Sequence, residues 1–243
     1  MPEQASYAGV VDGQLVRLPG GQDASREQHV LHATLRAFVL HPSFPCLGAK
    51  AALHGDEYRI GAYGDLGKLT PVEALARDLR AFVAEQCGMR SGFSTFAAGF
   101  RAVARSDERT FETLLWETLQ RLHALDRENA WDAAASSDPQ DASFSFSLAG
   151  RAFFVVGMHP GSSRLARRFP TPLLLFNAKF QFDALRRDGR FERMQRKIRE
   201  RDVRLQGSLN PNLAAFGEDS EARQYSGRAV EAEWRCPFRP RSR

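Results

Sequence analysis

The segment 144–158 constrains the fold more than any other part of the sequence. It starts with Phe-Ser-Phe-Ser-Leu, in which apolar and polar residues alternate with the two-residue period of a half-buried strand. Ala149-Gly150 then predicts a two-residue turn, and the continuous apolar run Arg151–Met158 is typical of a buried strand. Together these residues predict a β-hairpin, with its second strand in the interior of the protein.

Apolar residues at helical spacing predict four helices in the rest of the chain. They lie at about 24–40, 70–87, 106–125 and 181–204, and the last is interrupted near Asp188-Gly189. Thr70-Pro-Val-Glu73 has the capping box and the first-turn proline of a helix start. Short apolar segments at 57–63, 93–100 and 173–177 predict further strands. Because the strands come in hairpins between helices, the sequence predicts an α+β fold with a mainly antiparallel sheet.

The domain organisation follows from length and composition. The chain has 243 residues, of which 43% are hydrophobic and 26% are charged, and this suffices for one domain with a sizeable core. Residues 1–24 are polar and rich in glycine, so we expect an irregular N-terminal segment there. We expect residues 25–243 to form the single domain.

Charge and cysteine content argue against several classes of protein. The net charge is +5, but the RRM, zinc-finger and basic-zipper patterns of nucleic-acid-binding proteins are missing. Three cysteines without paired spacing argue against a disulfide framework and a zinc knuckle. No apolar run approaches the ~20 residues of a membrane helix, and no signal peptide is visible. We therefore expect a cytoplasmic protein that binds neither nucleic acid nor membranes.

Six blocks of residues, spread over about 38–238, occur in the order typical of one family, and the chain resembles the YqcI/YcgG family in them. The blocks are Phe44-Pro-Cys46; Phe144-Ser-Phe-Ser147; Gly157-Met-His-Pro160 with Ser163-Arg164 and Arg167-Arg168-Phe169; Phe176-Asn177 with Gln181-Phe182; the run from Gln206-Gly-Ser-Leu-Asn-Pro211 through Gly217-Glu218 and Ser220-Glu-Ala222 to Gln224-Tyr-Ser-Gly-Arg228; and Trp234-Arg-Cys-Pro-Phe238.

The resemblance implies haem binding and an enzymatic function. Members with assigned roles resemble N-hydroxylases of guanidine groups, in pathways to guanitoxin and D-cycloserine. We therefore expect a haem b oxygenase that uses O2 or peroxide to hydroxylate a guanidine nitrogen of arginine or of an arginine-derived small molecule. Since no GxGxxG motif follows a strand, electrons would come from an external donor. The alternative is a non-catalytic haem carrier or sensor, and the sequence is compatible with a homo-oligomer.

Three residues are candidates for the axial ligand of the haem iron, which needs an imidazole, thiolate, thioether or phenolate. His159 is the first, because it directly follows an apolar strand and precedes a group of arginines. Cys236 is second, because a thiolate favours O–O cleavage and aromatic residues flank it. Cys46 is third. Each also has a structural reading, as a hydrogen-bonded histidine or as a buried cysteine.

Charged side chains suggest binding partners for the cofactor and the substrate. Arg164, Arg167 and Arg168, with Ser163, are candidates for binding the haem propionates. The acidic loop with Glu218, Glu221 and Tyr225 is a candidate for a guanidinium substrate, although an exposed loop that starts a helix explains it equally well. One departure from the family pattern is Ala178-Lys179, where Leu-His is usual; it puts any role of that position in doubt.

Overall fold

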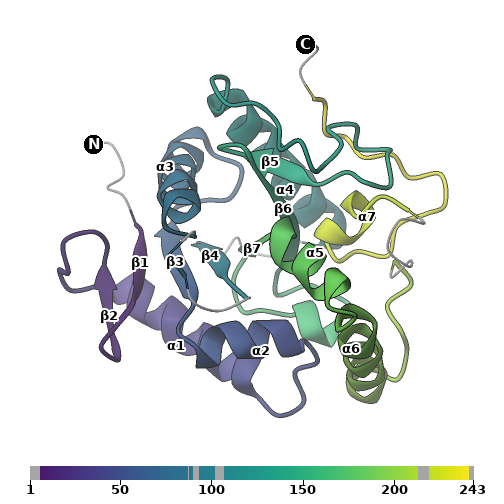
Figure 1. Cartoon of the computed structure of the whole chain (residues 1–243), viewed down its shortest axis with the longest axis horizontal. Coiled ribbons are helices and arrows are strands. Elements are labelled where there is room, and N and C mark those ends of the chain that lie inside the picture. Colours follow the sequence, from purple (N-terminus) through teal and green to yellow (C-terminus); the bar gives the residue numbers. More distant parts are fainter. Residues whose placement is uncertain (1–5, 87, 90–92, 102–106, 213–218, 241–243) are drawn as a thin grey trace.

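The protein is built around one seven-stranded sheet. The computed structural model describes residues 6–86, 88–89, 93–101, 107–212 and 219–240. The sheet has the strand order β2-β1-β3-β4-β7-β6-β5, and only β3 and β4 pair in parallel (Figure 1). The strands are β1 (Ala8–Val11), β2 (Gln14–Arg17), β3 (Tyr58–Tyr63), β4 (Thr95–Phe100), β5 (Phe146–Leu148), β6 (Arg151–Met158) and β7 (Leu173–Ala178). The predicted single-domain α+β fold with a mainly antiparallel sheet is confirmed.

The hairpin of β5 and β6 agrees with the sequence pattern. Leu148 pairs with Arg151, and the two residues between them have positive φ angles of 52° at Ala149 and 72° at Gly150. Two positive φ angles are the geometry of a type I′ turn, whose twist matches that of the flanking strands. The regular strand starts at Phe146, two residues later than expected. Strand β6 then lies between β5 and β7, which explains its unbroken apolar sequence.

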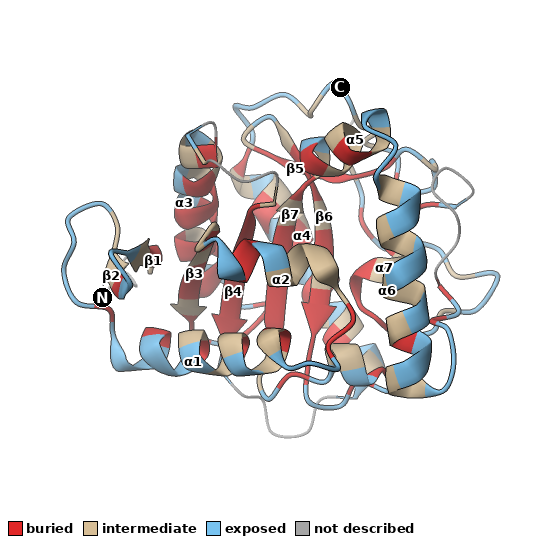
Figure 2. Ribbon diagram, turned by 60° about the horizontal axis from the view of Figure 1, so that its bottom comes forward, coloured by how far each residue is buried: buried red, intermediate tan, exposed pale blue. Residues whose placement is uncertain are grey.

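Helices cover both faces of the sheet, and two hydrophobic clusters lie between them and the strands. The helices are α1 (Arg26–Leu40), α2 (Leu47–His54), α3 (Leu69–Gln86), α4 (Glu108–Leu125), α5 (Lys179–Arg187), α6 (Phe191–Gln206) and α7 (Ala222–Tyr225), with a 3-10 turn at Leu165–Arg167. One cluster joins α3 and α4 to the sheet, and the other joins α1 and α2 to its opposite face. Figure 2 shows the central strands of the sheet mostly buried behind α2.

The four predicted helical regions are confirmed, with small differences at their ends. Ser25 closes a capping box on α1, and Asp107 caps α4 through the N–H of Thr110. Helix α3 begins at Leu69, so Thr70 lies inside it and is not the cap. The fourth region is two helices, α5 and α6, separated at Gly189, which has a φ of 62°.

The N-terminal segment corrects one expectation. Residues 1–24 are not irregular throughout, because β1 and β2 form a hairpin within them and β1 extends the sheet beside β3. Asp12 and Gly13 form its turn, with φ angles of 49° and 78°. Each strand has four residues, too few to show a period, although Asp-Gly is a known hairpin turn. Within the described residues, no helix is long and apolar enough to cross a membrane.

Candidate functional site

A cavity of about 250 Å³ lies between the sheet and the helices α2 and α6. Its floor is formed by alternate residues of β6, namely Phe154, Val156 and Met158, with Leu175 of β7. Because side chains alternate between the two faces of a strand, this spacing of two places all three β6 residues on the same face. The floor is apolar, whereas the rim carries polar and charged groups. They are Cys46, Ser94, Thr95, Arg164, Arg167, Asn177, Gln181, Asp202, Asn210 and Gln224.

Cys46 is the cavity residue that can coordinate iron through a thiolate. It is the N-cap of α2, where its sulfur accepts the N–H of Ala49 at 3.5 Å. Burial raises the pKa of the thiol, while the backbone N–H groups at the helix start and the nearby Arg167 act in the opposite direction. The free cysteine is therefore a neutral thiol at neutral pH. A coordinated metal would remove this proton, since a bound thiol is deprotonated outright.

Arg167 places a positive charge beside Cys46. Its guanidinium donates hydrogen bonds to three backbone carbonyl oxygens, those of Gly157 at 2.9 Å, Gln224 at 3.2 Å and Tyr225 at 3.4 Å. Burial lowers its pKa to about 10, so it stays charged at neutral pH. These bonds occupy donors of a guanidinium that the sequence predicts at a propionate, and they tie the end of α7 to β6.

Arg164 and Asp202 form a buried ion pair in the cavity wall. The Nη2 of Arg164 donates to Oδ2 of Asp202 at 2.5 Å, and the two side chains are only 8% and 10% exposed. Arg164 also donates to the hydroxyl and the carbonyl oxygen of Ser208, at 3.1 and 2.9 Å. The pair joins the loop after β6 to α6. It therefore holds α6 over the cavity.

The two other residues expected at a propionate do not line the cavity. Arg168 donates to the carbonyl oxygen of Ser162 at 2.8 Å. Ser163 is exposed, and both its N–H and its hydroxyl bond to the carboxylate of Glu108, at 2.9 and 2.7 Å. Of the predicted propionate-binding group, the structure brings only Arg164 and Arg167 to the cavity.

His159 lies on the other side of the sheet from the cavity. Because side chains alternate between the two faces of β6, His159 lies on the same face as Gly157. Gly157 packs against α4. Its fully buried ring stacks on Phe111 of α4 with 4.3 Å between ring centres. Neither ring nitrogen has a hydrogen-bond partner within the described part of the chain. Burial lowers its pKa, so the imidazole is neutral.

Cys236 also lies away from the cavity. It is buried in the hydrophobic cluster of α3 and α4, together with Trp116 and Phe238. Burial raises the pKa of its thiol to about 12. Of the three ligand candidates, Cys46 is therefore the one that lines the cavity.

Two of the residues predicted to bind substrate, Glu221 and Tyr225, are hydrogen-bonded to each other. Glu221 Oε1 accepts hydrogen bonds from the hydroxyls of Tyr225 at 2.6 Å and Ser145 at 2.7 Å. The Tyr225 oxygen also accepts the N–H of Phe146 at 3.1 Å, which fastens α7 to β5. Neither Glu221 nor Tyr225 lines the cavity, and Glu218 lies outside the described residues. Lys179, at the departure from the family pattern, forms an ion pair with Asp183 at 3.0 Å.

Glu221 is expected to make stability depend on pH. Burial raises its pKa from 4.5 to about 7, against the opposing effect of the hydrogen bonds from Tyr225 and Ser145 and of the charges on Lys179 and Arg186. Because the pKa is raised in the folded state, the protonated carboxyl makes its full contribution to stability at a pH below the ordinary pKa of 4.5. This contribution is lost as the pH rises through 7. Glu221→Gln keeps an acceptor oxygen but cannot ionise.

We therefore expect the variant to gain stability over the wild type between pH 5 and 8, by up to about 3 kcal/mol. Urea unfolding of both proteins at pH 5, 6, 7 and 8 measures this difference. Equal free energies of unfolding at all four values would show that Glu221 is not desolvated. Asp138→Asn, at an exposed aspartate, controls for a general effect of removing one carboxylate.

Most of the family blocks meet at the cavity. Four of the six contribute lining residues: all of Phe44-Pro-Cys46, Met158 with Arg164 and Arg167, Asn177 with Gln181 and Phe182, and Asn210 with Gln224. The blocks around 144–147 and 234–238 pack into the core of the sheet instead. Asp202 is not predicted from the sequence, and no role is predicted for Asn177, Gln181, Asn210 and Gln224, which also line the cavity. Asn177, Gln181, Asn210 and Gln224 belong to the family blocks, and this membership could have indicated a role at the site. Asp202 lies in a run of basic residues outside the blocks, so the sequence contained no such indication for it.

Comparison with known proteins matches most of the chain to one family. The model of the YqcI/YcgG family matches residues 35–239. The uncharacterized protein YcgG of Bacillus subtilis (strain 168) is 28% identical over 205 residues, which are 81% of each chain. The uncharacterized protein YqcI of the same strain is 26% identical over 204 residues, or 80% of each chain. No solved structure matches the chain.

Proposed function

Because the chain belongs to the YqcI/YcgG family, we propose that it is a haem-dependent oxygenase that hydroxylates a guanidine nitrogen of arginine or of an arginine-derived small molecule. The observation that supports this most is the convergence of four family blocks on one largely apolar cavity that contains a thiol and buried charges. Such a combination of apolar walls and a few polar groups is typical of cofactor and substrate sites.

The chemistry of the cavity residues fits a haem. Cys46 supplies a thiol at a helix start, where a thiolate is stabilised by backbone N–H groups. Arg167 supplies a positive charge next to it, and the floor supplies the apolar contacts that a porphyrin face needs. The volume of about 250 Å³ is below the ~300–1,000 Å³ of ordinary ligand pockets. The cavity must therefore widen to take a porphyrin. Helix α6 forms one of its walls, and Asp202 is the one buried residue of this helix.

The haem, when bound, would supply the oxidising chemistry, with O2 or peroxide as oxidant and with electrons from an external donor. Cys46 would hold the iron, and the apolar floor would exclude water from the reacting nitrogen. The cavity also contains acceptors for a guanidinium. Asp202 accepts from the guanidinium of Arg164, and Asn177, whose amide N–H donates to the carbonyl oxygen of Phe154 at 3.2 Å, has an amide oxygen that can accept.

Reconstitution with haem tests the proposal. The purified protein should take up haem and show a Soret band. With L-arginine, a reductant and O2, it should form a product heavier by one oxygen atom, detected by mass spectrometry. A protein that takes up no haem would refute the proposal. A haem protein that oxidises none of a panel of guanidine compounds would instead support the alternative, a haem carrier or sensor.

A further inference from the structure

A second hollow, a surface cleft of about 360 Å³, lies along α2 and α6. Apolar side chains of α2, α5 and α6 line it, among them Leu47 and Met194. Three cations complete the lining, and all three are exposed: Arg190, Arg193 and Lys197. An apolar surface with a cationic rim suits a ligand that has an apolar body and acidic groups at one end.

The cleft adjoins the cavity that contains Cys46. Phe93 lines both hollows, and its ring packs on Gly48, where an added Cβ would come within 3.2 Å of it. Helices α2 and α6 border both spaces. On α2, Leu47 lines the cleft and Gly48 lines the cavity. On α6, Lys197 lines the cleft and Ile198 lines the cavity. One ligand could thus fill the cavity and extend its end into the cleft, past Phe93.

The cations of the cleft differ from the arginines near the cavity in what they bind. The guanidinium groups of Arg164 and Arg167 are engaged with Asp202, Ser208 and backbone carbonyls. Within the described residues, no carboxylate forms an ion pair with Arg190, Arg193 or Lys197. Their charges are therefore available to a carboxylate from outside the chain.

We propose that Arg190, Arg193 and Lys197 bind the carboxylates of an apolar ligand whose body enters the cavity beyond Phe93. This rests on the proposed function, under which the ligand is haem and the carboxylates are its propionates. A substrate carboxylate is the other source of the same chemistry. The apolar lining of the cleft favours the porphyrin edge, because an amino acid would leave that lining in contact with its polar backbone groups.

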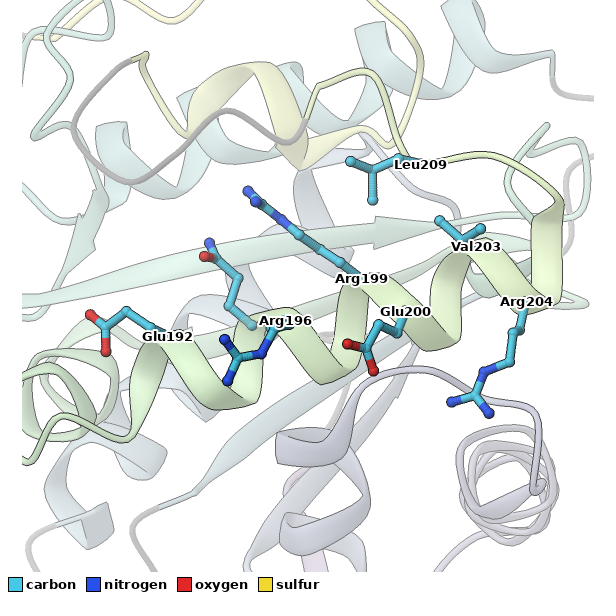
Figure 3. Close-up of a pocket in the computed structure, with 8 residues that line it drawn as sticks. Glu192, Arg196, Arg199, Glu200, Val203, Arg204 and Leu209 are labelled. Carbon is cyan, nitrogen blue, oxygen red and sulfur yellow. The ribbon is translucent and has the colours of Figure 1, made fainter.

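Metal-free protoporphyrin IX, followed by fluorescence, is the probe for the test, since it needs no axial ligand. Its dimethyl ester has the same body without the charges. The test variant is Arg193→Ala/Lys197→Ala. The control is Arg196→Ala/Arg204→Ala, which removes two charges from the same helix. Both control residues line a broad hollow of about 820 Å³ on another side of α6, together with Arg199 and the carboxylates of Glu192 and Glu200 (Figure 3).

The wild type should bind the free acid at least about tenfold more tightly than the ester, and added salt should reduce this preference. The test variant should lose the preference, whereas the control should keep it. The proposal is overturned if acid and ester bind the wild type alike, if neither binds, or if both double variants lose affinity equally. It is also overturned if the test variant weakens binding of L-arginine, measured by calorimetry, but not of the porphyrin.

These outcomes are separate from those of the proposed function. A protein that binds the porphyrin acid through the cleft but does not oxidise guanidine compounds would refute the oxygenase and leave the carboxylate site in place. A protein that forms the oxidised product, but binds acid and ester alike, would do the reverse.

Discussion

Cys46→Ser is expected to abolish the thiolate signature of the haem-loaded protein. Serine is a better N-cap than cysteine and can still accept the N–H of Ala49, so α2 should be retained. A hydroxyl, however, does not replace a thiolate on haem iron. We expect the ferrous–CO spectrum to lose its long-wavelength Soret band and haem affinity to fall by more than about tenfold, or more than about 1.4 kcal/mol of binding free energy.

Two variants away from the cavity serve as controls for this result. His159→Phe keeps a ring stacked on Phe111, and Cys236→Ala removes the buried thiol of the core cluster. Both should keep the thiolate spectrum. If His159→Phe loses haem while Cys46→Ser keeps a normal spectrum, Cys46 is not the ligand. Circular dichroism of all three variants distinguishes loss of haem from loss of the fold.

Asp202→Ala is expected to cause the largest loss of stability, about 3–5 kcal/mol. The substitution leaves the guanidinium of Arg164 buried without its carboxylate, although the two bonds to Ser208 remain. Breaking a buried ion pair costs more than the pair itself contributes, because the remaining charge stays desolvated. Urea unfolding at neutral pH measures the difference.

A matched surface pair tests this explanation. Arg109 and Glu231 form an ion pair with side chains 75% and 51% exposed, so Arg109→Ala should cost no more than about 1 kcal/mol. The double variant Arg164→Met/Asp202→Leu should recover most of the stability, because it leaves no unpaired charge. If the double variant is as unstable as Asp202→Ala, the loss comes from the packing of α6 and not from the buried charge.

Local patterns in the sequence predicted most of the regular structure. The hairpin of β5 and β6 depends on a two-residue period and a two-residue turn, both of which lie within one short segment. The start of α4 at Asp107 has the same local origin. Strand β1 was missed, because four residues do not show a period and its pairing with β3 joins residues about 50 positions apart in the chain.

The site was predicted only in part, because its geometry depends on contacts distant in sequence. The family blocks identified residues that meet at the cavity, Cys46 and Arg167 among them. They did not show on which face of β6 the cavity lies, and that face decides between Cys46 and His159. A residue at the end of a strand points to one face of the sheet or the other, because side chains alternate along the strand. Which of the two faces borders the cavity depends on the packing of α2 and α4, and local sequence does not determine that packing.

The sequence by itself thus determined the class of fold, the central hairpin and the membership of the family, because local periodicity and short motifs carry that information. Only the tertiary structure decided which partner each charged side chain binds. It paired Arg164 with Asp202 across 38 residues, bonded Arg167 to backbone carbonyls and left Arg193 and Lys197 beside an apolar cleft. The partner of a charged side chain depends on which groups the fold brings within hydrogen-bond distance, and no local pattern records that distance.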